Sequence, residues 1–202
     1  EFCMSIIDNK IKKVLIMASK EAGEVLRGSY KKKKKVTSKG RNDWVTNEDI
    51  RIEKSIIKLI RKNFPDSNFI GEETEKSKNT NNLTWIIDPI DGTNNFIHDY
   101  PFFCTSIGVL VEGKIKYGAI YDPLRDELFY AQKNVGSFLN GKRISVSKVT
   151  KLSDSLLCTG FITSNKAYAK KNIENFKRLV FKARSIRRDG SAALDLAYVA
   201  CG

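Results

Sequence analysis

The sequence predicts an α+β protein whose chain passes into an α/β unit near residue 150. Two helices with apolar faces open the chain, a series of hairpin-forming strands follows, and strand and helix alternate after about residue 149. Hairpins build antiparallel sheets, so we expect the two helices to pack on one face of such a sheet. We therefore assign residues 1–149 to an N-terminal α+β lobe that carries the functional site, and residues 150–202 to the beginning of a C-terminal α/β lobe.

Both early helices are predicted from apolar residues that recur at three- and four-residue spacing. The first helix ends near Gly28. The second starts at Thr46 or Asn47, because either side chain can cap it, and it stops before Pro65. Asp49 then falls in the first turn of this helix, where a negative charge is favourable.

The middle of the chain carries short runs of β-branched, aromatic and alternating apolar residues, which predict strands. Glu112-Gly113 and Asn140-Gly141 separate two pairs of these runs and predict hairpin turns. The polar segments 37–43 and 76–82 are predicted as loops. Strands are expected at residues 44–46, 69–73, 85–87, 104–111, 114–121, 127–131, 136–139 and 143–146.

The last fifty residues alternate between strand and helix patterns. Residues 156–159 and 183–187 are predicted as strands on either side of a helix at 166–181, and a helix of small residues follows Gly190. On the first of these helices we expect the apolar side chains to face inward, namely Ile173, Phe176, Leu179 and Val180.

Composition restricts the class of protein. Of the 202 residues, 41% are hydrophobic and 29% are charged, which fits a soluble globular protein, and no apolar run reaches the length of a membrane span. The four cysteines lack the paired spacing of metal ligands, which favours a reducing, cytoplasmic location. A formal charge of +13 is compatible with RNA or an acidic partner, whereas the lysine run 31–35 is more simply interpreted as a solvated loop.

The most informative stretch is residues 88–93, Asp-Pro-Ile-Asp-Gly-Thr, directly after the apolar strand predicted at 85–87. Pro89 has no N–H to donate, so we expect the strand to end at Asp88. Asp88 and Asp91 would then leave the strand end together, beside a Gly-Thr pair with free backbone N–H groups. Carboxylate clusters bind hard divalent cations, and exposed amides suit a phosphate, so this stretch predicts a metal-dependent phosphate site. The alternative is a strand followed by an Asp-Gly turn and a surface carboxylate.

A third acid strengthens the metal hypothesis. Glu72 follows another predicted strand, and if the two strands are neighbours, Glu72, Asp88 and Asp91 converge. Three carboxylates repel one another unless cations neutralise them, and Mg²⁺ prefers a few carboxylates together with phosphate oxygens. Two such ions can activate a water and neutralise a leaving oxygen. The Thr93 hydroxyl can hold that water or cap a short helix, and the Gly92 and Thr93 N–H groups can bind phosphate oxygens.

Three segments give the chain a recognisable likeness. Gly71-Glu72-Glu73, residues 85–93 and Gly190-Ser191-Ala192-Ala193 resemble the inositol monophosphatase family of Mg²⁺-dependent, lithium-sensitive phosphatases, and Tyr121-Asp122-Pro123 and Asn140-Gly141 favour its bacterial inositol-1-monophosphatase branch. The resemblance covers nearly the whole chain. It implies a layered αβαβα sandwich of the sugar-phosphatase type shared with fructose-1,6-bisphosphatase, and a homodimer.

The same resemblance implies roles for individual residues. Glu72, Asp88 and the Ile90 carbonyl correspond to ligands of a first Mg²⁺, Asp88 and Asp91 correspond to ligands of a second, and Glu72 also approaches a third. Asp49 and Thr93 correspond to the pair that orients the attacking water, with Glu72 also in the catalytic set. The substrate-binding positions are Asp91, Gly92, Thr93, Ser191 and Ala192, where Gly92 and Thr93 correspond to the phosphate cradle and the others to positions near the sugar hydroxyls.

One part of the family pattern is absent. The family's second signature, a Trp-Asp followed by small residues, supplies a further ligand to the second metal, and this sequence stops at Gly202 before it. We expect the second lobe to be C-terminally incomplete and residues 1–202 alone to be impaired.

The resulting expectation is a Mg²⁺-dependent hydrolysis of inositol-1-phosphate to inositol and phosphate. Two alternatives stay open. The first is 3′-phosphoadenosine 5′-phosphate or fructose-1,6-bisphosphate as the substrate. The second is a binding role with RNA or the transcription machinery, which some bacterial members of the family have. A small phosphorylated polyol is the expected ligand, with no membrane partner.

Overall fold

The computed structural model describes residues 2–40, 43–73, 83–161 and 165–202. The predicted loop at 76–82 lies outside these described residues. In chain order the elements are α1 (Phe2–Ser29), β1 (Val36–Gly40), β2 (Asp43–Thr46), α2 (Asn47–Asn63), β3 (Asn68–Gly71), β4 (Thr84–Asp91), α3 (Thr93–Ile97), β5 (Cys104–Val111), β6 (Lys114–Asp122), β7 (Glu127–Gln132), β8 (Gly136–Leu139), β9 (Lys142–Arg143), a 3-10 turn (Leu152–Asp154), β10 (Leu156–Cys158), α4 (Lys166–Val180), β11 (Ser185–Arg187) and α5 (Ala192–Cys201).

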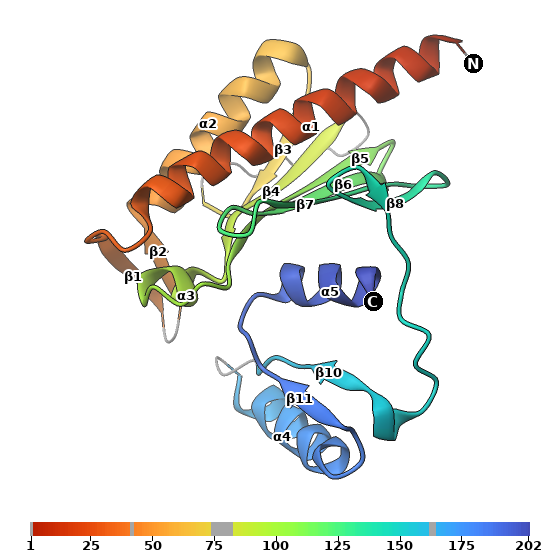
Figure 1. The fold of residues 1–202 in the computed structure, drawn as a ribbon. Coiled ribbons are helices and arrows are strands. Elements are labelled where there is room, and N and C mark those ends of the chain that lie inside the picture. The colour runs from red at the N-terminus through yellow and green to blue at the C-terminus, as the bar shows by residue number, and fades with distance from the viewer. Residues whose placement is uncertain (1, 41–42, 74–82, 162–164) are drawn as a thin grey trace.

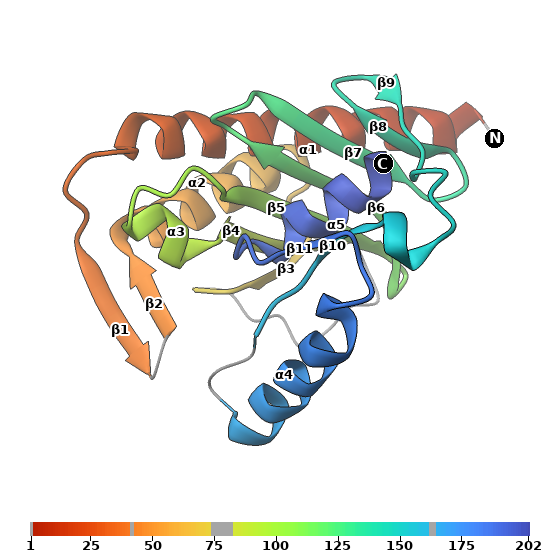
Figure 2. The same cartoon turned by 60° about the horizontal axis from the view of Figure 1, so that its bottom comes forward.

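The described elements stack in alternating layers of helix and sheet. Figure 1 shows α1 and α2 over a large sheet, α5 beneath that sheet, then the β10–β11 pair, and α4 outermost. Figure 2 shows the same α5 lying across the face of the sheet that is turned away from α1. This order of layers is the αβαβα sandwich that the family resemblance implies. The division into lobes at residue 149 stays a prediction.

The two early helices bury the faces that their apolar spacing predicts. On α1, Leu15, Ala18 and Leu26 are completely buried, and on α2 the same holds for Ile52 and Ile60. Burying one such aliphatic side chain contributes about 1.5–3 kcal/mol, so this shared face supplies much of the stability of the core.

The N-terminus of α2 is fixed by a capping box. The Thr46 hydroxyl accepts a hydrogen bond from the Asp49 N–H, and the Asp49 carboxylate accepts one from the Thr46 N–H. Of the two predicted caps, Thr46 is therefore the one used. The same bonds place Asp49, a predicted catalytic residue, on the buried side of the helix.

The main sheet has the described strand order β3-β4-β5-β6-β7-β8-β9. From β4 onward neighbouring strands are antiparallel, as predicted, but β3 and β4 are parallel. The expectation of a wholly antiparallel sheet was therefore wrong. The chain between Gly71 and Thr84 is long enough for a crossover, which parallel strands require, whereas a hairpin turn needs only a few residues.

The strand that ends in the focal motif is longer than predicted. β4 continues through Pro89 to Asp91, and its pairing with β5 is irregular between Asp88 and Asp91. An irregularity of this kind accommodates a proline, because no ladder hydrogen bond is required from its nitrogen. Asp88 therefore lies within a bulged strand, and Asp91 marks its end.

Two segments near residue 35 also differ from the prediction. Residues 37–40, expected in a loop, belong to β1, which pairs with β2 in an antiparallel hairpin. The lysine run is only partly solvated. The Lys34 side chain is 4% exposed, and its Nζ lies 2.6 Å from Asp99 Oδ1 and 4.8 Å from the centre of the Phe96 ring. One member of the run thus anchors the loop that follows α3.

The C-terminal part follows the predicted order of strand, helix, strand and helix. β10 and β11 are parallel, with α4 connecting them. The inward face predicted for α4 is confirmed only in part. No residue of the helix is fully buried, and Ile173 and Leu179 are 47% and 37% exposed, but Phe176 and Val180 are half-buried. Residues 144–146, predicted as part of a strand, are not in one. Within the described ranges, no helix combines the length and apolarity needed to cross a lipid bilayer.

Candidate functional site

The parallel pairing of β3 and β4 places two predicted ligands side by side. Gly71 pairs with Ile87, and the Glu72 N–H donates a hydrogen bond of 3.2 Å to the Ile87 carbonyl. Glu72 and Asp88 each follow one of these paired residues. The sequence analysis expects these acids to converge if their strands are neighbours, and this holds for the strands that precede Glu72 and Asp88.

Asp88 is the electrostatic centre of this cluster. Burial, followed by the charges of Glu72 and Asp91, raises the pKa of Asp88 from 3.8 to about 9. Its Oδ1 is buried without a hydrogen-bond partner among the described residues. A buried carboxylate oxygen without a donor is costly, so this atom is suited to a cation.

The side chains nevertheless do not form a finished coordination sphere. Within the described residues, no group of three or more Asp, Glu, His or Cys side chains is arranged to hold a metal ion. Glu72 and Asp91 are close enough to Asp88 to raise its pKa, but the Asp91 carboxylate accepts hydrogen bonds from residues at the start of α5. The unpartnered oxygen of Asp88 is consequently the observation that fits a metal.

Asp49 approaches the same cluster from α2. It is 2% exposed, and its Oδ2 accepts hydrogen bonds of 2.6 Å from both the N–H and the hydroxyl of Thr46. Burial, together with the charges of Glu73 and Glu72, raises the pKa of Asp49 to about 6, against the lowering effect of these two hydrogen bonds. A carboxylate with this pKa is better suited to accept a proton near neutral pH than an ordinary aspartate.

The Gly92-Thr93 turn follows directly. Gly92 has φ +93°, a conformation that favours glycine, and any side chain here would press against the Phe102 carbonyl. The Thr93 hydroxyl donates a hydrogen bond of 2.8 Å to the Ile90 carbonyl. This bond joins Thr93, predicted to orient water, to the carbonyl predicted as a metal ligand, while leaving the lone pairs of the hydroxyl free to accept.

Asp91 connects the motif to the C-terminal part of the chain. Its Oδ2 accepts hydrogen bonds from the Ser191 hydroxyl at 2.5 Å and from the Ala193 N–H at 2.7 Å. Ser191 is fully buried and also caps α5, whereas Ala192 is exposed. The structure thus brings Ser191 to Asp91, a residue 100 positions earlier in the sequence.

Two further residues support the site, and the motifs did not reveal them. Glu53 is completely buried and accepts a hydrogen bond of 2.8 Å from the Glu73 N–H. Asn95 donates hydrogen bonds of 2.7 Å to the carbonyls of Phe102 and Asp189. Glu53 carried a signal in the sequence, because it lies on the apolar face of α2, where a charged residue needs a partner.

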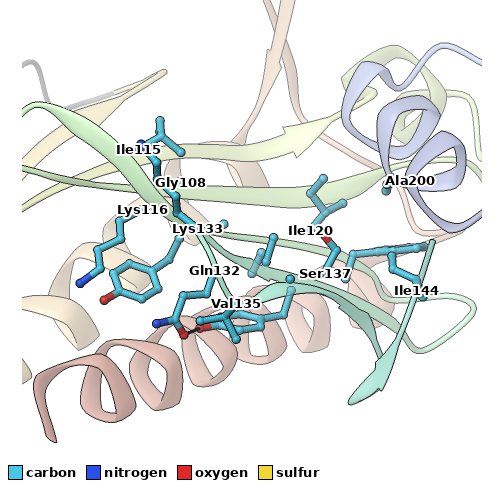
Figure 3. Close-up of a pocket in the computed structure, with 18 of the residues that line it drawn as sticks. Gly108, Ile115, Lys116, Ile120, Gln132, Lys133, Val135, Ser137, Ile144 and Ala200 are labelled. Carbon is cyan, nitrogen blue, oxygen red and sulfur yellow. Dashed lines mark hydrogen bonds between the residues drawn. The ribbon is translucent and has the colours of Figure 1, made fainter. Parts of the chain in front are cut away.

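The described residues also form a cavity that contains none of the carboxylates of this site. It has a volume of about 860 Å³ and lies between the sheet and α5, as Figure 3 shows, with Gly108, Ile120 and Ala200 among its walls. No Asp or Glu lines it. It therefore offers none of the carboxylates by which Mg²⁺ is usually held in proteins.

Comparison with known proteins agrees with the fold and the motif. The sequence profile of the inositol monophosphatase family matches residues 8–202. Inositol monophosphatase 2 of Solanum lycopersicum is 43% identical over 195 residues, which are 94% of this chain and 74% of that protein. The Nus factor SuhB of Escherichia coli K12 is 41% identical over 192 residues, covering 94% and 72%.

Solved structures give the same result. The extragenic suppressor protein suhB from Bartonella henselae aligns with a TM-score of 0.89 at 37% identity, over 95% of this chain and 75% of that one. The inositol monophosphatase from Anabaena (Nostoc) sp. PCC 7120 aligns with a TM-score of 0.83 at 38% identity, over 100% and 73%. On the profile match, the sequence identity and the shared fold, this chain belongs to the inositol monophosphatase family.

Proposed function

We propose that the protein is a Mg²⁺-dependent phosphomonoesterase that hydrolyses inositol-1-phosphate to inositol and phosphate. The observation that carries the proposal is the buried Oδ1 of Asp88, which lacks a hydrogen-bond partner among the described residues and is surrounded by the charges of other acids. Family membership supports a phosphatase, and the choice of substrate goes beyond it.

Each residue near Asp88 receives a task in this proposal. Glu72, Asp88, Asp91 and the Ile90 carbonyl would hold Mg²⁺, two or three ions in all. Bound Mg²⁺ would supply positive charge for the phosphate oxygens and lower the pKa of a bound water. Asp49 and Thr93 would orient that water, because Asp49 can accept its proton and the Thr93 hydroxyl can accept a hydrogen bond from it.

The substrate would lie against the turn and the start of α5. Gly92 and Thr93 would hold the phosphate through their N–H groups, which lie at the start of α3. Asp91, Ser191 and Ala192 would face the hydroxyls of the polyol. Ala192 is exposed at the first position of α5, whereas Ser191 is buried and acts on Asp91.

The test measures phosphate release and Mg²⁺ binding on the same protein. Inositol-1-phosphate, 3′-phosphoadenosine 5′-phosphate and fructose-1,6-bisphosphate are compared over several Mg²⁺ concentrations, and melting temperature is followed in the same titration. We expect inositol-1-phosphate to have the highest kcat/KM and Mg²⁺ to raise the melting temperature. The variant Asp88→Asn should lose both. Preference for either of the other substrates would change the assignment. The absence of both hydrolysis and stabilisation by Mg²⁺ would refute it.

A second role, in binding, is favoured by the basic charge and by relatives named Nus factor SuhB. We propose that RNA or an acidic protein of the transcription machinery contacts the exposed lysines 32, 33 and 35; Lys34 is excluded because it is buried against Asp99. Replacing these three with glutamate should abolish salt-dependent RNA binding. The matched control replaces three exposed lysines of α4, namely Lys170, Lys171 and Lys177. Equal binding by both triple variants would contradict this role.

The remaining family-based expectations are also proposals. We propose a homodimer, inhibition by lithium and a cytoplasmic location. Light scattering at micromolar concentration tests the dimer, and lithium titration of phosphate release tests the inhibition. A monomer would contradict the proposed homodimer, and activity that is unchanged by lithium would contradict the proposed inhibition.

A further inference from the structure

One buried carboxylate has no task in the proposed reaction. Glu53 is completely buried in α2, four residues after Asp49 and on the same face as Ile52 and Ile56. An aliphatic side chain there would pack with these neighbours at no electrostatic cost. A buried carboxylate is expensive by comparison, so its hydrogen-bond partners indicate what it does.

Glu53 has a hydrogen-bond partner on one side of Glu72 and a close backbone contact on the other. Glu53 Oε2 accepts a hydrogen bond of 2.8 Å from the Glu73 N–H. On the other side, the Glu53 carboxylate lies so close to Gly71 that a Cβ at residue 71 would overlap it. Gly71 therefore allows the carboxylate to contact the backbone directly, and a single side chain fixes the chain immediately before and after Glu72.

We propose that Glu53 is a positioning residue that holds Glu72 beside Asp88, a role that rests on the proposed metal-dependent function. Glu72 is exposed, so burial does not hold it. Its backbone is held by the bond from its own N–H to Ile87 and by the contacts of Glu53 with the residues on either side. Groups that hold a metal ligand in this way typically change metal affinity 10–100-fold when they are replaced.

Three variants separate positioning from stability. Glu53→Leu keeps an apolar fit in α2 but removes the acceptor for Glu73. Glu53→Gln keeps an acceptor of the same size. Ile56→Ala is the matched control, because it creates a cavity in the same helix face and leaves the acceptor of the Glu73 N–H in place. The dissociation constant for Mg²⁺ is measured by calorimetry on metal-free protein, and amide hydrogen exchange at Glu73 is measured in parallel.

We expect Glu53→Leu to weaken Mg²⁺ binding about tenfold or more and to speed exchange at Glu73, even where its melting temperature equals or exceeds that of the native protein. Glu53→Gln should stay within about threefold of native affinity. Ile56→Ala should melt earlier and bind Mg²⁺ normally. Native affinity in Glu53→Leu, or equal weakening in Ile56→Ala, overturns the positioning role and leaves the metal site standing. Absence of Mg²⁺ binding by the native protein overturns the proposed function and this inference with it.

Discussion

Replacing Asp49 by asparagine should make the metal-free protein more stable while it removes activity. Asp49 is buried, and burial raises its pKa from 3.8 to about 6 despite two hydrogen bonds from Thr46. The folded protein therefore favours the neutral carboxyl. Asparagine is neutral at every pH, nearly the same size, and can still accept a hydrogen bond from Thr46.

The size and the sign follow from the two pKa values. A carboxyl whose pKa is higher in the folded state stabilises the fold while it is protonated, and that stabilisation is lost as the pH rises from about 4 through about 6. One pKa unit corresponds to about 1.4 kcal/mol, so the full loss is about 3 kcal/mol at pH 7. Asp49→Asn avoids this loss. Its free energy of unfolding should match the native value near pH 4 and exceed it by about 3 kcal/mol at pH 7.5.

Urea unfolding in EDTA between pH 4 and pH 8 measures this difference. Asp8→Asn is the control with the opposite sign, because hydrogen bonds from Tyr117 and Lys116 lower the pKa of Asp8. Asp8→Asn should have a lower free energy of unfolding than native protein at pH 7, and this difference should vanish as the pH falls. Saturating Mg²⁺ should cancel the advantage of Asp49→Asn. A pH-independent difference, or an Asp49→Asn variant less stable than native protein at pH 7.5 in EDTA, would refute the reasoning.

Three further predictions concern metal binding and local anchoring. Asp88→Asn should abolish the rise in melting temperature on adding Mg²⁺ and lower kcat at least about 100-fold; a normal Mg²⁺ response would exclude Asp88 as a ligand. Ser191→Ala should lower the free energy of unfolding by about 1 kcal/mol through the lost cap and weaken Mg²⁺ binding through Asp91, whereas Ser191→Thr keeps both; calorimetry showing equal affinity would limit Ser191 to capping. Lys34→Ala should destabilise the fold by about 1 kcal/mol in urea and Lys33→Ala by less than about 0.5 kcal/mol; equal effects would contradict the anchoring role of Lys34.

Much of the fold could be predicted because it depends on local pattern. The apolar spacing of the first two helices reports directly which face is buried, and Thr46 lies three residues before an acid that completes its capping box. The hairpins at Glu112-Gly113 and Asn140-Gly141 were equally accessible. Glu112 and Asn140 have positive φ, and each is followed by a glycine with positive φ, which is the backbone that tight hairpin turns need.

Two of the errors share a physical origin, because in both a distant partner overrode a local preference. Pro89 disfavours a regular strand, but β4 passes through it because the pairing with β5 is irregular there. Five consecutive lysines repel one another and favour a solvated loop, but Asp99, 65 positions away, holds Lys34 in place. No window of neighbouring residues contains either partner.

In the candidate site too, features that depend on local sequence could be predicted, whereas contacts between distant residues could not. Glu72, Asp88 and Asp91 could be proposed from the sequence because each stands at or near the end of a predicted strand, and a strand end is a local feature. The contacts that hold two of them were not predicted. Glu53, which acts on the backbone around Glu72, was not singled out, and Ser191 was predicted to bind substrate but not to bond to Asp91. Carboxylates gathered for a metal repel one another and cost stability, so their geometry has to be imposed by contacts from elsewhere in the fold. Those contacts link residues that are far apart in sequence, which is why the motif indicates the chemistry while only the folded chain shows what keeps it in place.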